Sequence, residues 1–394
     1  MQIGIIGAPN KGKSTLFSAL TMNEVPIADY PFTTINPNVG VAYAVARCVE
    51  KELSVKCRAR NSLCIDGMRM LPINIMDVAG LVEGAHEGKG MGNQFLNDLA
   101  GADAYLLVVD ASGKTDSAGL QSGQENNDPV QDVIMVKKEL VSWLSGIVRN
   151  HMNTISRNPD AAEALHSVLA GLKVTKDQIS AAIEKSFLTS SNINWADNDI
   201  DVFADNLLSV SKPILIVANK SDSKEAPRHI SDLKAKFGDA NVIGCSAAVE
   251  LALRKAVRQG VIAYTSGNRS FEIKKEDVSE EQKKALEYMR AFIEKEGTNV
   301  QAVIDRAVFG LLDDIVAYPV EDENKYSDHF GNVLPDAILI HEGSTAYDLA
   351  AKIHTDIAKG MLYAIDVKKK MRIAKDYVLK DNDVIKIVTA AKQK

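Results

Sequence analysis

Several features that would place this chain of 394 residues in other protein classes are scarce or missing. It has no run of about 18 apolar residues, which argues against a membrane-spanning helix. Its apolar N-terminal stretch leads into a glycine-containing motif instead of a small-residue cleavage site, which argues against a signal peptide. The net charge is -6, which argues against a surface coated with basic residues for nucleic acid. We therefore expect a cytoplasmic protein.

Cysteine is also scarce, with four residues in the chain. Cys48, Cys57, Cys64 and Cys245 show no paired spacing of the kind found in metal-binding motifs. Cys57 and Cys64 could bind a metal or cross-link. Isolated, reduced thiols of a cytosolic protein are the favoured interpretation.

The composition that remains is that of a globular protein. Hydrophobic residues make up 46% of the chain and charged residues 25%, which is enough to build a full core. A chain of this length is too long for one ordinary domain, so two or three domains are expected.

Short apolar runs alternate with helical patterns in the first part of the chain, which indicates an α/β fold with a mostly parallel sheet. The later runs are continuously apolar, as expected for strands buried on both faces. A weaker run, Val39–Val45, would complete a six-stranded sheet. The other five predicted strands are Gln2–Ile6, Ile73–Asp77, Ala104–Val109, Pro213–Ala218 and Asn241–Gly244.

The strand pattern stops for about a hundred residues after Asp110, where helical periodicity takes over. We interpret residues 118–208 as a helical insertion in a first domain that spans residues 1–270. Within it, Thr175 and Gln178 have the spacing of a capping box that opens a helix. Residues 271–314 read as a helical connector with a charged helix, Ser279–Lys295. Residues 315–394 read as a small α+β domain with one helix, Ala346–Ala358.

One motif carries most of the functional information. Residues 7–14 match G-x-x-x-x-G-K-[ST] at every fixed position, between a predicted strand and a predicted helix, Lys13–Thr21. Backbone amides of such a loop turn toward a nucleotide's phosphates at a helix N-terminus. Lys13 should lie between the β- and γ-phosphates, with the Ser14 hydroxyl on Mg²⁺. The phosphate-binding residues predicted here are Ala8, Pro9, Asn10, Lys11, Gly12, Lys13, Ser14 and Thr15.

Two further motifs follow strands, as nucleotide-binding elements do in open α/β sheets. Asp77-Val78-Ala79-Gly80 closes a strand; Asp77 would hold Mg²⁺, and the Gly80 amide would meet the γ-phosphate. Residues 219–222 read Asn-Lys-Ser-Asp. The Asp222 carboxylate can accept two hydrogen bonds from guanine that adenine cannot donate, which predicts guanine selectivity. The predicted guanine-binding residues are Asn219, Lys220, Asp222, Ser246, Ala247 and Ala248.

The first switch region is expected at residues 29–34. One threonine there must reach Mg²⁺ and the γ-phosphate, and we favour Thr34 over Thr33. Many GTPases place a glutamine after the glycine of D-x-x-G to orient the attacking water, but here that position is Leu81. Hydrolysis should be slow unless another group positions water. Nearby candidates are His86, which we include among the catalytic residues with Lys13, Thr34 and Gly80, and the carboxylates of Glu83 and Glu87.

Asn10 suggests a second cofactor besides Mg²⁺. In some P-loop GTPases an asparagine at this position helps to hold a K⁺ ion that supplies positive charge. The alternative, which we favour, is that Asn10 only stabilises the loop.

Two segments resemble the switch regions of the Obg family of GTPases, in the archaeal form of its YchF branch. They are Asp29–Gly40 and Asp77–Phe95. Residues 334–337, 343–356 and 381–383 of the tail resemble a TGS domain, which implies a β-grasp-like fold. The resemblance implies nucleotide-dependent association with the ribosome or other translation components. A leucine after D-x-x-G is typical of the family. Several YchF proteins lack the aspartate-bearing guanine element and prefer ATP, whereas this chain has Asp222.

The expected function is Mg²⁺-dependent hydrolysis of GTP by a switch protein that binds GTP, GDP and a ribosomal or RNA partner, through the TGS domain and the helical insertion. Two alternatives remain: an ATPase with the same machinery, and a nucleotide-sensing scaffold with little turnover, which Leu81 favours. A basic cluster, Lys368–Lys370 with Arg372, could meet RNA phosphate or could be a solvated turn.

Overall fold

The structure, a computed structural model, describes residues 1–22, 39–78, 80–85, 99–116, 120, 127–189, 195–275 and 277–390. The chain divides into two compact units. Unit 1 comprises residues 1–23, 35–41 and 74–303, and unit 2 comprises residues 24–34, 42–73 and 304–394.

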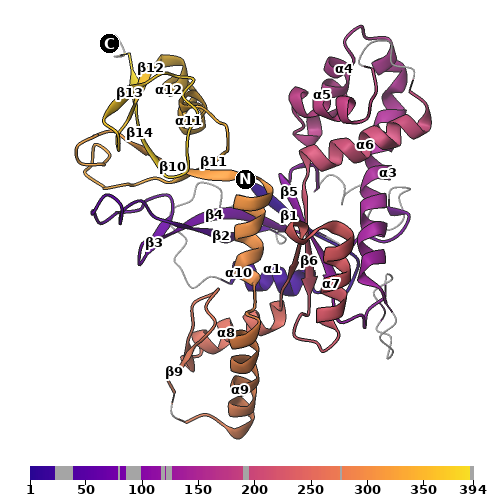
Figure 1. Cartoon of the computed structure of the whole chain (residues 1–394), viewed down its shortest axis with the longest axis vertical. Helices are drawn as coiled ribbons and strands as arrows, with labels where there is room; N and C mark the ends of the chain where they lie inside the picture. Colours follow the sequence, from indigo (N-terminus) through magenta and orange to yellow (C-terminus); the bar gives the residue numbers. More distant parts are fainter. Residues whose placement is uncertain are drawn as a thin grey trace. The chain divides into compact units, whose positions relative to one another are not determined.

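The larger sheet has the order β2-β4-β1-β5-β6-β7, with β3 paired to β4 (Figure 1). Strands β4, β1, β5, β6 and β7 are parallel to one another along this order, and β5 is buried along its whole length, which agrees with its continuous apolar run. The strands are β1 (Gln2–Ile6), β2 (Val39–Arg47), β3 (Leu63–Ile65), β4 (Met68–Asp77), β5 (Ala104–Asp110), β6 (Ile214–Asn219) and β7 (Val242–Gly244).

The mostly parallel sheet is confirmed, but among the described residues it has seven strands, one more than the expected six. The additional strand, β3, forms an antiparallel hairpin with the first part of β4, which begins five residues earlier than its predicted start at Ile73. Its three residues are too few to show an alternating pattern, so the sequence carries no usable signal for it.

Helices of unit 1 pack against this sheet and against one another. Helix α1 contacts both β1 and α8, and α9 shares a small core with α8 that includes Leu253, Phe271 and Ile293. Their bounds are α1 (Lys13–Thr21), α7 (Ala226–Phe237), α8 (Ala247–Arg258) and α9 (Glu280–Lys295), with a short hairpin of β8 (Ile262–Ala263) and β9 (Glu272–Ile273). The chain continues into α10 (Val300–Arg306). In the described part of the chain, no helix combines the length and apolarity that a membrane crossing requires.

In the described part of the region between β5 and β6, the expected helical character is seen in four α-helices: α3 (Pro129–Ser156), α4 (Ala161–Leu169), α5 (Lys176–Lys185) and α6 (Asp197–Ser211) (Figure 1). Helix α3 links two cores. Its first half places Val133 and Leu140 in the sheet core, and its second half places Val148 in a separate core with the other three helices. The capping box is confirmed, because Thr175 and Gln178 exchange side-chain and backbone hydrogen bonds at the start of α5.

The C-terminal part of unit 2 is the expected α+β domain. Its mixed sheet has the order β11-β10-β14-β12-β13, with β10 and β14 parallel at the centre and the other pairs antiparallel. Helices α11 and α12 pack against it over a core that includes Leu349 and Ile385. The elements are β10 (Asp314–Val320), β11 (Ile338–His341), α11 (Ala346–Ile353), α12 (Thr355–Gly360), β12 (Met361–Asp366), β13 (Met371–Ile373) and β14 (Asp383–Thr389).

The prediction of one continuous helix over Ala346–Ala358 is wrong. The backbone of His354 is extended, with φ -167° and ψ 139°, and its Nδ1 accepts a hydrogen bond from the Asp356 amide at 3.1 Å. His354 therefore ends α11 and caps the next helix, α12.

The four cysteines are free, as expected, but the expectation that they are all isolated from one another is wrong. Cys48, Cys57 and Cys64 of unit 2 lie close together with Glu50, whereas Cys245 is buried in unit 1. Strand β2, the following segment and β3 bring the three residues together, which their sequence spacing does not indicate.

Candidate nucleotide site

The loop between β1 and α1 has the backbone that its glycines permit. Gly12 caps α1 in a left-handed conformation, with φ 92°. A Cβ atom at Gly12 would lie 2.3 Å from Nδ2 of Asn219, so the close approach of these two segments requires glycine. The loop therefore delivers the chain to a helix N-terminus whose first amides are free to face an anion.

Lys13 and Ser14 begin α1. The Lys13 side chain turns back over the loop, and its Nζ donates a hydrogen bond to the Ala8 carbonyl at 2.8 Å. Burial lowers the pKa of the Lys13 ammonium to about 8, and the nearby charge of Asp77 opposes this effect. Ser14 is exposed and Thr15 is half-buried. A cation that leaves a carbonyl and approaches a phosphate gains a stronger, charge-assisted partner.

Lys11 differs from Lys13, because its side chain points away from the loop. It is completely buried, donates to the Thr115 carbonyl at 2.6 Å and forms an ion pair with Asp132 of α3 at 2.7 Å. Only the backbone of Lys11 is therefore placed to contact a phosphate. Asn10 is exposed, with a left-handed φ of 59°.

Asp77 ends β4 and pairs in register with Ile5 of β1, so it lies at the same sheet edge as the loop. Its carboxylate is close enough to act on the charge of Lys13. Within the described residues, the buried Oδ1 of Asp77 has no hydrogen-bond partner. A buried carboxylate oxygen of this kind is suited to a cation or to a water bound to one.

Gly80 and Leu81 follow immediately and tie the strand to the loop. The Leu81 amide donates to the Gly7 carbonyl at 3.0 Å. A Cβ at Gly80 would lie 3.0 Å from the backbone nitrogen of Pro9, so no side chain fits between the two segments. The Leu81 side chain is 2% exposed and lies in the sheet core. Leu81 therefore cannot orient the attacking water, because its side chain is buried in the core and has no polar group.

Asn219 connects two loops of the site. Its Nδ2 donates to the Lys11 carbonyl at 3.1 Å, and its Oδ1 accepts from the Ala247 amide at 3.1 Å. The side chain is 3% exposed. One amide group thus holds the phosphate loop and the loop that starts α8 at a fixed separation.

Asp222 is held by Ser246. The Ser246 hydroxyl donates to Oδ1 of Asp222 at 2.6 Å and also accepts from the Val249 amide at 3.3 Å, where it caps α8. Ala247 is buried and Ala248 is exposed. Because one oxygen is occupied by Ser246, the carboxylate has a fixed orientation and its other oxygen remains available to a ligand.

Lys220 is held by Asp110, a residue that was not among the predicted site residues. Its ammonium forms an ion pair at 2.7 Å with Asp110, a completely buried carboxylate at the end of β5. Burial raises the pKa of Asp110, but hydrogen bonds from Lys220, Ser112 and Thr115 outweigh burial and lower it. The signal that was available is an aspartate at the carboxyl end of an apolar strand, the same pattern that identified Asp77.

Four of the predicted positions cannot be compared with the structure. Thr33, Thr34, His86 and Glu87 lie outside the described residues. Glu83, the remaining candidate for positioning water, is exposed.

The basic cluster of unit 2 is largely paired. Lys368 forms an ion pair with Glu52 at 2.8 Å, Lys369 pairs with Asp366 at 2.5 Å, and the Arg372 guanidinium lies 3.8 Å from the centre of the Tyr363 ring. These contacts weaken the interpretation of this turn as a phosphate-binding patch, because two of its three lysine charges, those of Lys368 and Lys369, already have partners.

Three families match consecutive parts of the chain. A family described as "50S ribosome-binding GTPase" matches residues 2–139, and one described as "Obg-like GTPase YGR210-like, G4 motif-containing domain" matches residues 217–322. A family described as "TGS domain" matches residues 330–389.

Relatives with known names agree with these matches. The chain is 50% identical to "Uncharacterized GTP-binding protein MJ1332" of Methanocaldococcus jannaschii over 99% of both chains. It is 31% identical to "Ribosome-binding ATPase YchF" of Mycoplasma genitalium over 57% of both chains. Among solved structures, "GTP binding protein from Pyrococcus horikoshii OT3" is 35% identical, with a TM-score of 0.79, over 99% of this chain and 100% of the other.

Proposed function

The chain belongs to the Obg-like GTPases of the YchF type, with a nucleotide domain and a C-terminal TGS domain, and we propose that it is a Mg²⁺-dependent switch that hydrolyses GTP. The observation that carries the proposal is the Asp222 carboxylate, oriented by Ser246 beside the loop that Asn219 ties to the phosphate-binding segment. Guanine recognition and phosphate binding thereby belong to one rigid arrangement.

The phosphates bind along the loop from Ala8 to Thr15. Backbone amides at the start of α1 supply donors, Lys13 exchanges the Ala8 carbonyl for the β- and γ-phosphates, and Lys11 contributes its amide alone. Asn219, Lys220 and Asp222 surround the base with Ser246, Ala247 and Ala248. Asp222 accepts from guanine, and the stem of Lys220 lies along the ring.

The residues present fit a Mg²⁺ ion. Asp77 offers a buried oxygen without a partner among the described residues, and Ser14 offers an exposed hydroxyl at the first turn of α1. Thr34 would complete the protein's share of the ligands. When bound, the ion would neutralise charge that develops on the phosphate oxygens.

Hydrolysis requires water to attack the γ-phosphorus while the bond to the β–γ bridging oxygen breaks, giving GDP and phosphate. Lys13 and the Gly80 amide stabilise the negative charge on the transferring group. Leu81 is buried in the core, so the attacking water needs another partner, and we propose His86 for this role. The intrinsic rate is accordingly slow.

A monovalent cation is a second candidate cofactor, because Asn10 lies exposed in the phosphate-binding loop. If Asn10 helps to hold K⁺, hydrolysis is faster in KCl than in NaCl, and the difference disappears in Asn10→Ala. Equal rates in the two salts would leave Asn10 with the role of stabilising the loop.

Nucleotide preference separates this function from an ATPase. The relative in Mycoplasma genitalium carries the name of an ATPase, whereas Asp222 favours guanine here. Competition binding should give tighter binding of GTP than of ATP. In Asp222→Asn, GTP affinity should fall by roughly 10- to 100-fold, since hydrogen bonds to a charged group contribute about 1.5–3 kcal/mol. Tighter binding of ATP by the wild-type chain would contradict the proposal.

The partner we propose is the ribosome or its RNA, contacted in the cytoplasm through the TGS domain and the helical insertion. The names of the family matching residues 2–139 and of the YchF relative support this assignment. Co-sedimentation with ribosomes should differ between GDP and a non-hydrolysable GTP analogue. Equal co-sedimentation would exclude the switch model while leaving the nucleotide site intact.

The buried Leu81 is also consistent with a scaffold that binds nucleotide and hydrolyses very little of it, because Leu81 does not position water. Single-turnover hydrolysis with and without ribosomes distinguishes the two. A switch enzyme is accelerated by its partner, whereas a scaffold shows the same negligible rate in both conditions.

A further inference from the structure

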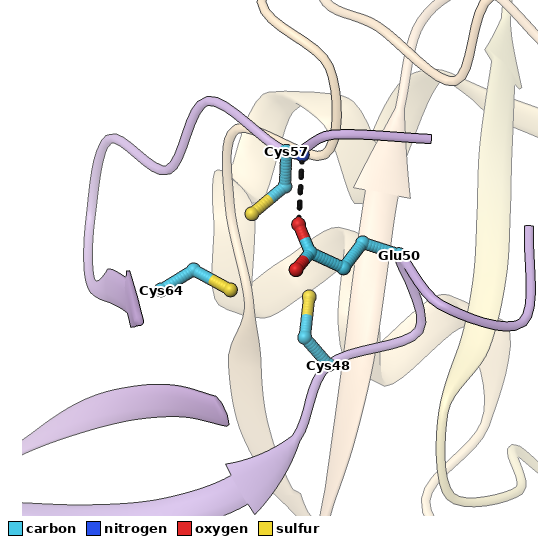
Figure 2. A group of neighbouring side chains, drawn as sticks. All are labelled: Cys48, Glu50, Cys57 and Cys64. Atoms are coloured by element: carbon cyan, nitrogen blue, oxygen red, sulfur yellow. Dashed lines mark hydrogen bonds between the residues drawn. The ribbon is translucent and has the colours of Figure 1, made fainter. Parts of the chain in front are cut away.

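A cluster of three thiols and one carboxylate lies in unit 2, among residues that the nucleotide site does not use. Cys48 follows β2, Glu50 lies two residues later, Cys57 belongs to the following segment, and Cys64 is the middle residue of β3. Their sulfur atoms and a Glu50 oxygen all lie within 4.8 Å of one another. Figure 2 shows the four side chains converging on one point.

The spacing suits a tetrahedral metal ion. Zinc–sulfur bonds of about 2.3 Å place the sulfurs of a tetrahedral site about 3.8 Å apart, so small side-chain rotations would close the cluster around an ion. A disulfide would instead require two sulfurs at about 2.0 Å, and these cysteines are free.

Backbone contacts hold the ligands in place. One Glu50 oxygen accepts a hydrogen bond from the Cys57 amide at 2.9 Å, which leaves the other oxygen for a ligand (Figure 2). The Cys48 amide donates to the Gly67 carbonyl in the β3–β4 turn at 2.9 Å. Cys48 is buried and the other three residues are half-buried, so an ion would be shielded from water on most sides.

Two buried donors adjoin the cluster. Arg69 lies directly opposite Cys64 in the β3–β4 ladder, so the two side chains share a face. Its Nη1 and the hydroxyl of Tyr318 are both buried, and neither has a hydrogen-bond partner within the described residues. The Arg69 charge acts on Glu50, and Cys48 interacts with Tyr318.

These donors answer an electrostatic requirement. Three thiolates and a carboxylate carry four negative charges, of which a divalent cation offsets two. The Arg69 guanidinium offsets a third, and the Tyr318 hydroxyl can donate to a thiolate. Donors placed behind the ligands in this way orient them and stabilise their charged form.

We propose that Cys48, Glu50, Cys57 and Cys64 bind one Zn²⁺ ion as a structural site. Thiolate ligands in a tetrahedral arrangement favour zinc over Mg²⁺ or Ca²⁺, which prefer oxygen. With four protein ligands the coordination is closed, leaving no position for a substrate.

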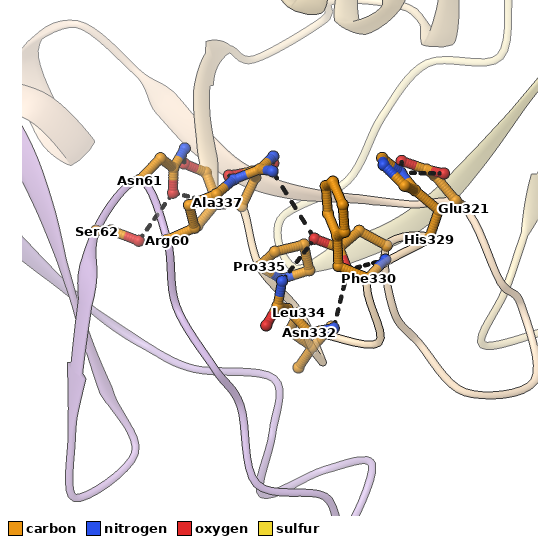
Figure 3. A network of polar contacts seen from close by, with 12 residues as sticks. Arg60, Asn61, Ser62, Glu321, His329, Phe330, Asn332, Leu334, Pro335 and Ala337 are labelled. Carbon is orange, nitrogen blue, oxygen red and sulfur yellow. Dashed lines mark hydrogen bonds and ion pairs between the residues drawn. The ribbon is translucent and has the colours of Figure 1, made fainter. Parts of the chain in front are cut away.

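The segment that carries the ligands explains what the ion would do. Residues 48–62 contain no helix or strand. The segment is joined to residues 333–337 by the Arg58 and Arg60 amides, which donate to Val333 and Pro335 at 2.8 and 2.7 Å. Asn61 and Ala337 exchange two hydrogen bonds of 3.0 Å (Figure 3). The ion would fix this irregular segment of unit 2 so that its edge can pair with the loop before β11.

The zinc content of the full-length protein tests the proposal. After purification under reducing conditions and dialysis, elemental analysis should find about one zinc per chain in the wild type and in Cys245→Ser, which removes the only cysteine outside the cluster. In Cys57→Ser and Cys64→Ser, zinc affinity should fall by at least about 100-fold, since even residues behind the ligands contribute 10- to 100-fold. Tyr318→Phe removes a donor behind the ligands, so it should lower zinc affinity by only about 10- to 100-fold.

A spectroscopic probe keeps the test independent of the folding of these variants. Titration of the metal-stripped wild-type chain with Co²⁺ should produce thiolate-to-cobalt charge-transfer absorption and the intense visible bands of tetrahedral cobalt. Absence of both bands, with the thiols reduced, would overturn the proposal. So would equal zinc binding by Cys57→Ser and the wild type, or a disulfide among these cysteines that forms without metal uptake. Iron in place of zinc would overturn the assignment of the metal.

Discussion

At the scale of single residues, the two lysines of the phosphate-binding loop show how a motif divides its work. The Lys13 ammonium donates to the Ala8 carbonyl, and in the proposed function it exchanges this partner for phosphate. Lys11 is a permanent part of the core, since its ammonium is completely buried against Asp132 and Thr115. The motif fixes Lys13 as a phosphate-binding lysine and leaves the position of Lys11 variable, so only the three-dimensional contacts show that Lys11 is structural.

The Lys11–Asp132 pair gives a prediction about stability. Asp132→Ala leaves a buried ammonium without its counter-charge and should reduce the free energy of unfolding by about 3–5 kcal/mol. The double variant Lys11→Met/Asp132→Leu replaces both charges by apolar groups and should recover most of that loss. Urea unfolding without nucleotide measures both. A double variant as unstable as Asp132→Ala would show that the geometry of the pair, and not the uncompensated charge, is what matters.

The buried carboxylate of Asp110 gives a prediction about pH. Its folded pKa is lowered, because hydrogen bonds from Lys220, Ser112 and Thr115 outweigh burial. Stability from this group is therefore present above the unfolded pKa, about 3.9, and is lost as the pH falls through the lower folded value.

We expect Asp110→Asn to be less stable than the wild type at neutral pH, with the difference shrinking below about pH 4. Unfolding free energies measured by urea titration at several pH values test this. The matched control is Asp116→Asn, which changes a half-buried carboxylate that accepts a hydrogen bond from the Leu120 amide at 2.7 Å. The stability difference of this control should not follow the same course with pH. A constant Asp110→Asn difference across the acid range would mean that the carboxylate's charge is unimportant.

At the scale of elements, the sequence predicted those structures whose signals are local. Strand β5 is a continuous apolar run and is buried throughout, and α1 has the bounds that its motif implies. Two unpredicted features have different causes. His354 interrupts a run of good helix formers because its ring accepts from the Asp356 amide and caps the next helix. The pairing of Asp110 depends on Lys220, which lies 110 residues away, although the position of Asp110 at the end of an apolar strand was a usable local signal.

The cysteine cluster is the clearest case of information that spacing does not carry. Known zinc motifs place pairs of ligands close together in the chain, whereas Cys48 and Cys57 lie in an irregular segment and Cys64 lies in the short strand β3. The turn between β3 and β4 and the segment before β3 bring the three cysteines together. No periodic pattern predicts this arrangement, because residues 48–62 form no helix or strand and β3 has three residues.

The start of α5 gives a prediction at this scale. Thr175 accepts from the Gln178 amide, and the Gln178 side chain accepts from the Thr175 amide. Thr175→Ala removes the cap and should cost about 1 kcal/mol of unfolding free energy. Ser156→Ala, at the exposed end of α3, is the matched control and should change stability by less than about 0.5 kcal/mol. If the two variants proved equally stable, the capping box would contribute nothing to this helix.

At the scale of the whole molecule, the two proposed ligand sites draw on different compact units. The described residues of the nucleotide site all belong to unit 1, and the four residues of the cysteine cluster all belong to unit 2. The sites share no residue. Each ligand that binds the folded chain stabilises it by mass action, about 2.7 kcal/mol when the free ligand is at 100 times its dissociation constant.

We therefore expect hydrogen exchange to respond to each ligand in a different part of the chain. Saturating Mg²⁺ and GTP should slow exchange at residues 8–15 and 246–248, by up to about 100-fold for amides that exchange only when their site opens. Zinc added to the metal-stripped protein should slow exchange at residues 48–64. The Cys64→Ser variant should lose the response to zinc and keep the response to GTP. The Asp222→Asn variant should lose the response to GTP and keep the response to zinc. Because the two ligand sets share no residue, a zinc-dependent change at residues 8–15 as large as that at residues 48–64 would reveal a coupling between them, and would turn the structural site into a candidate regulator of nucleotide binding.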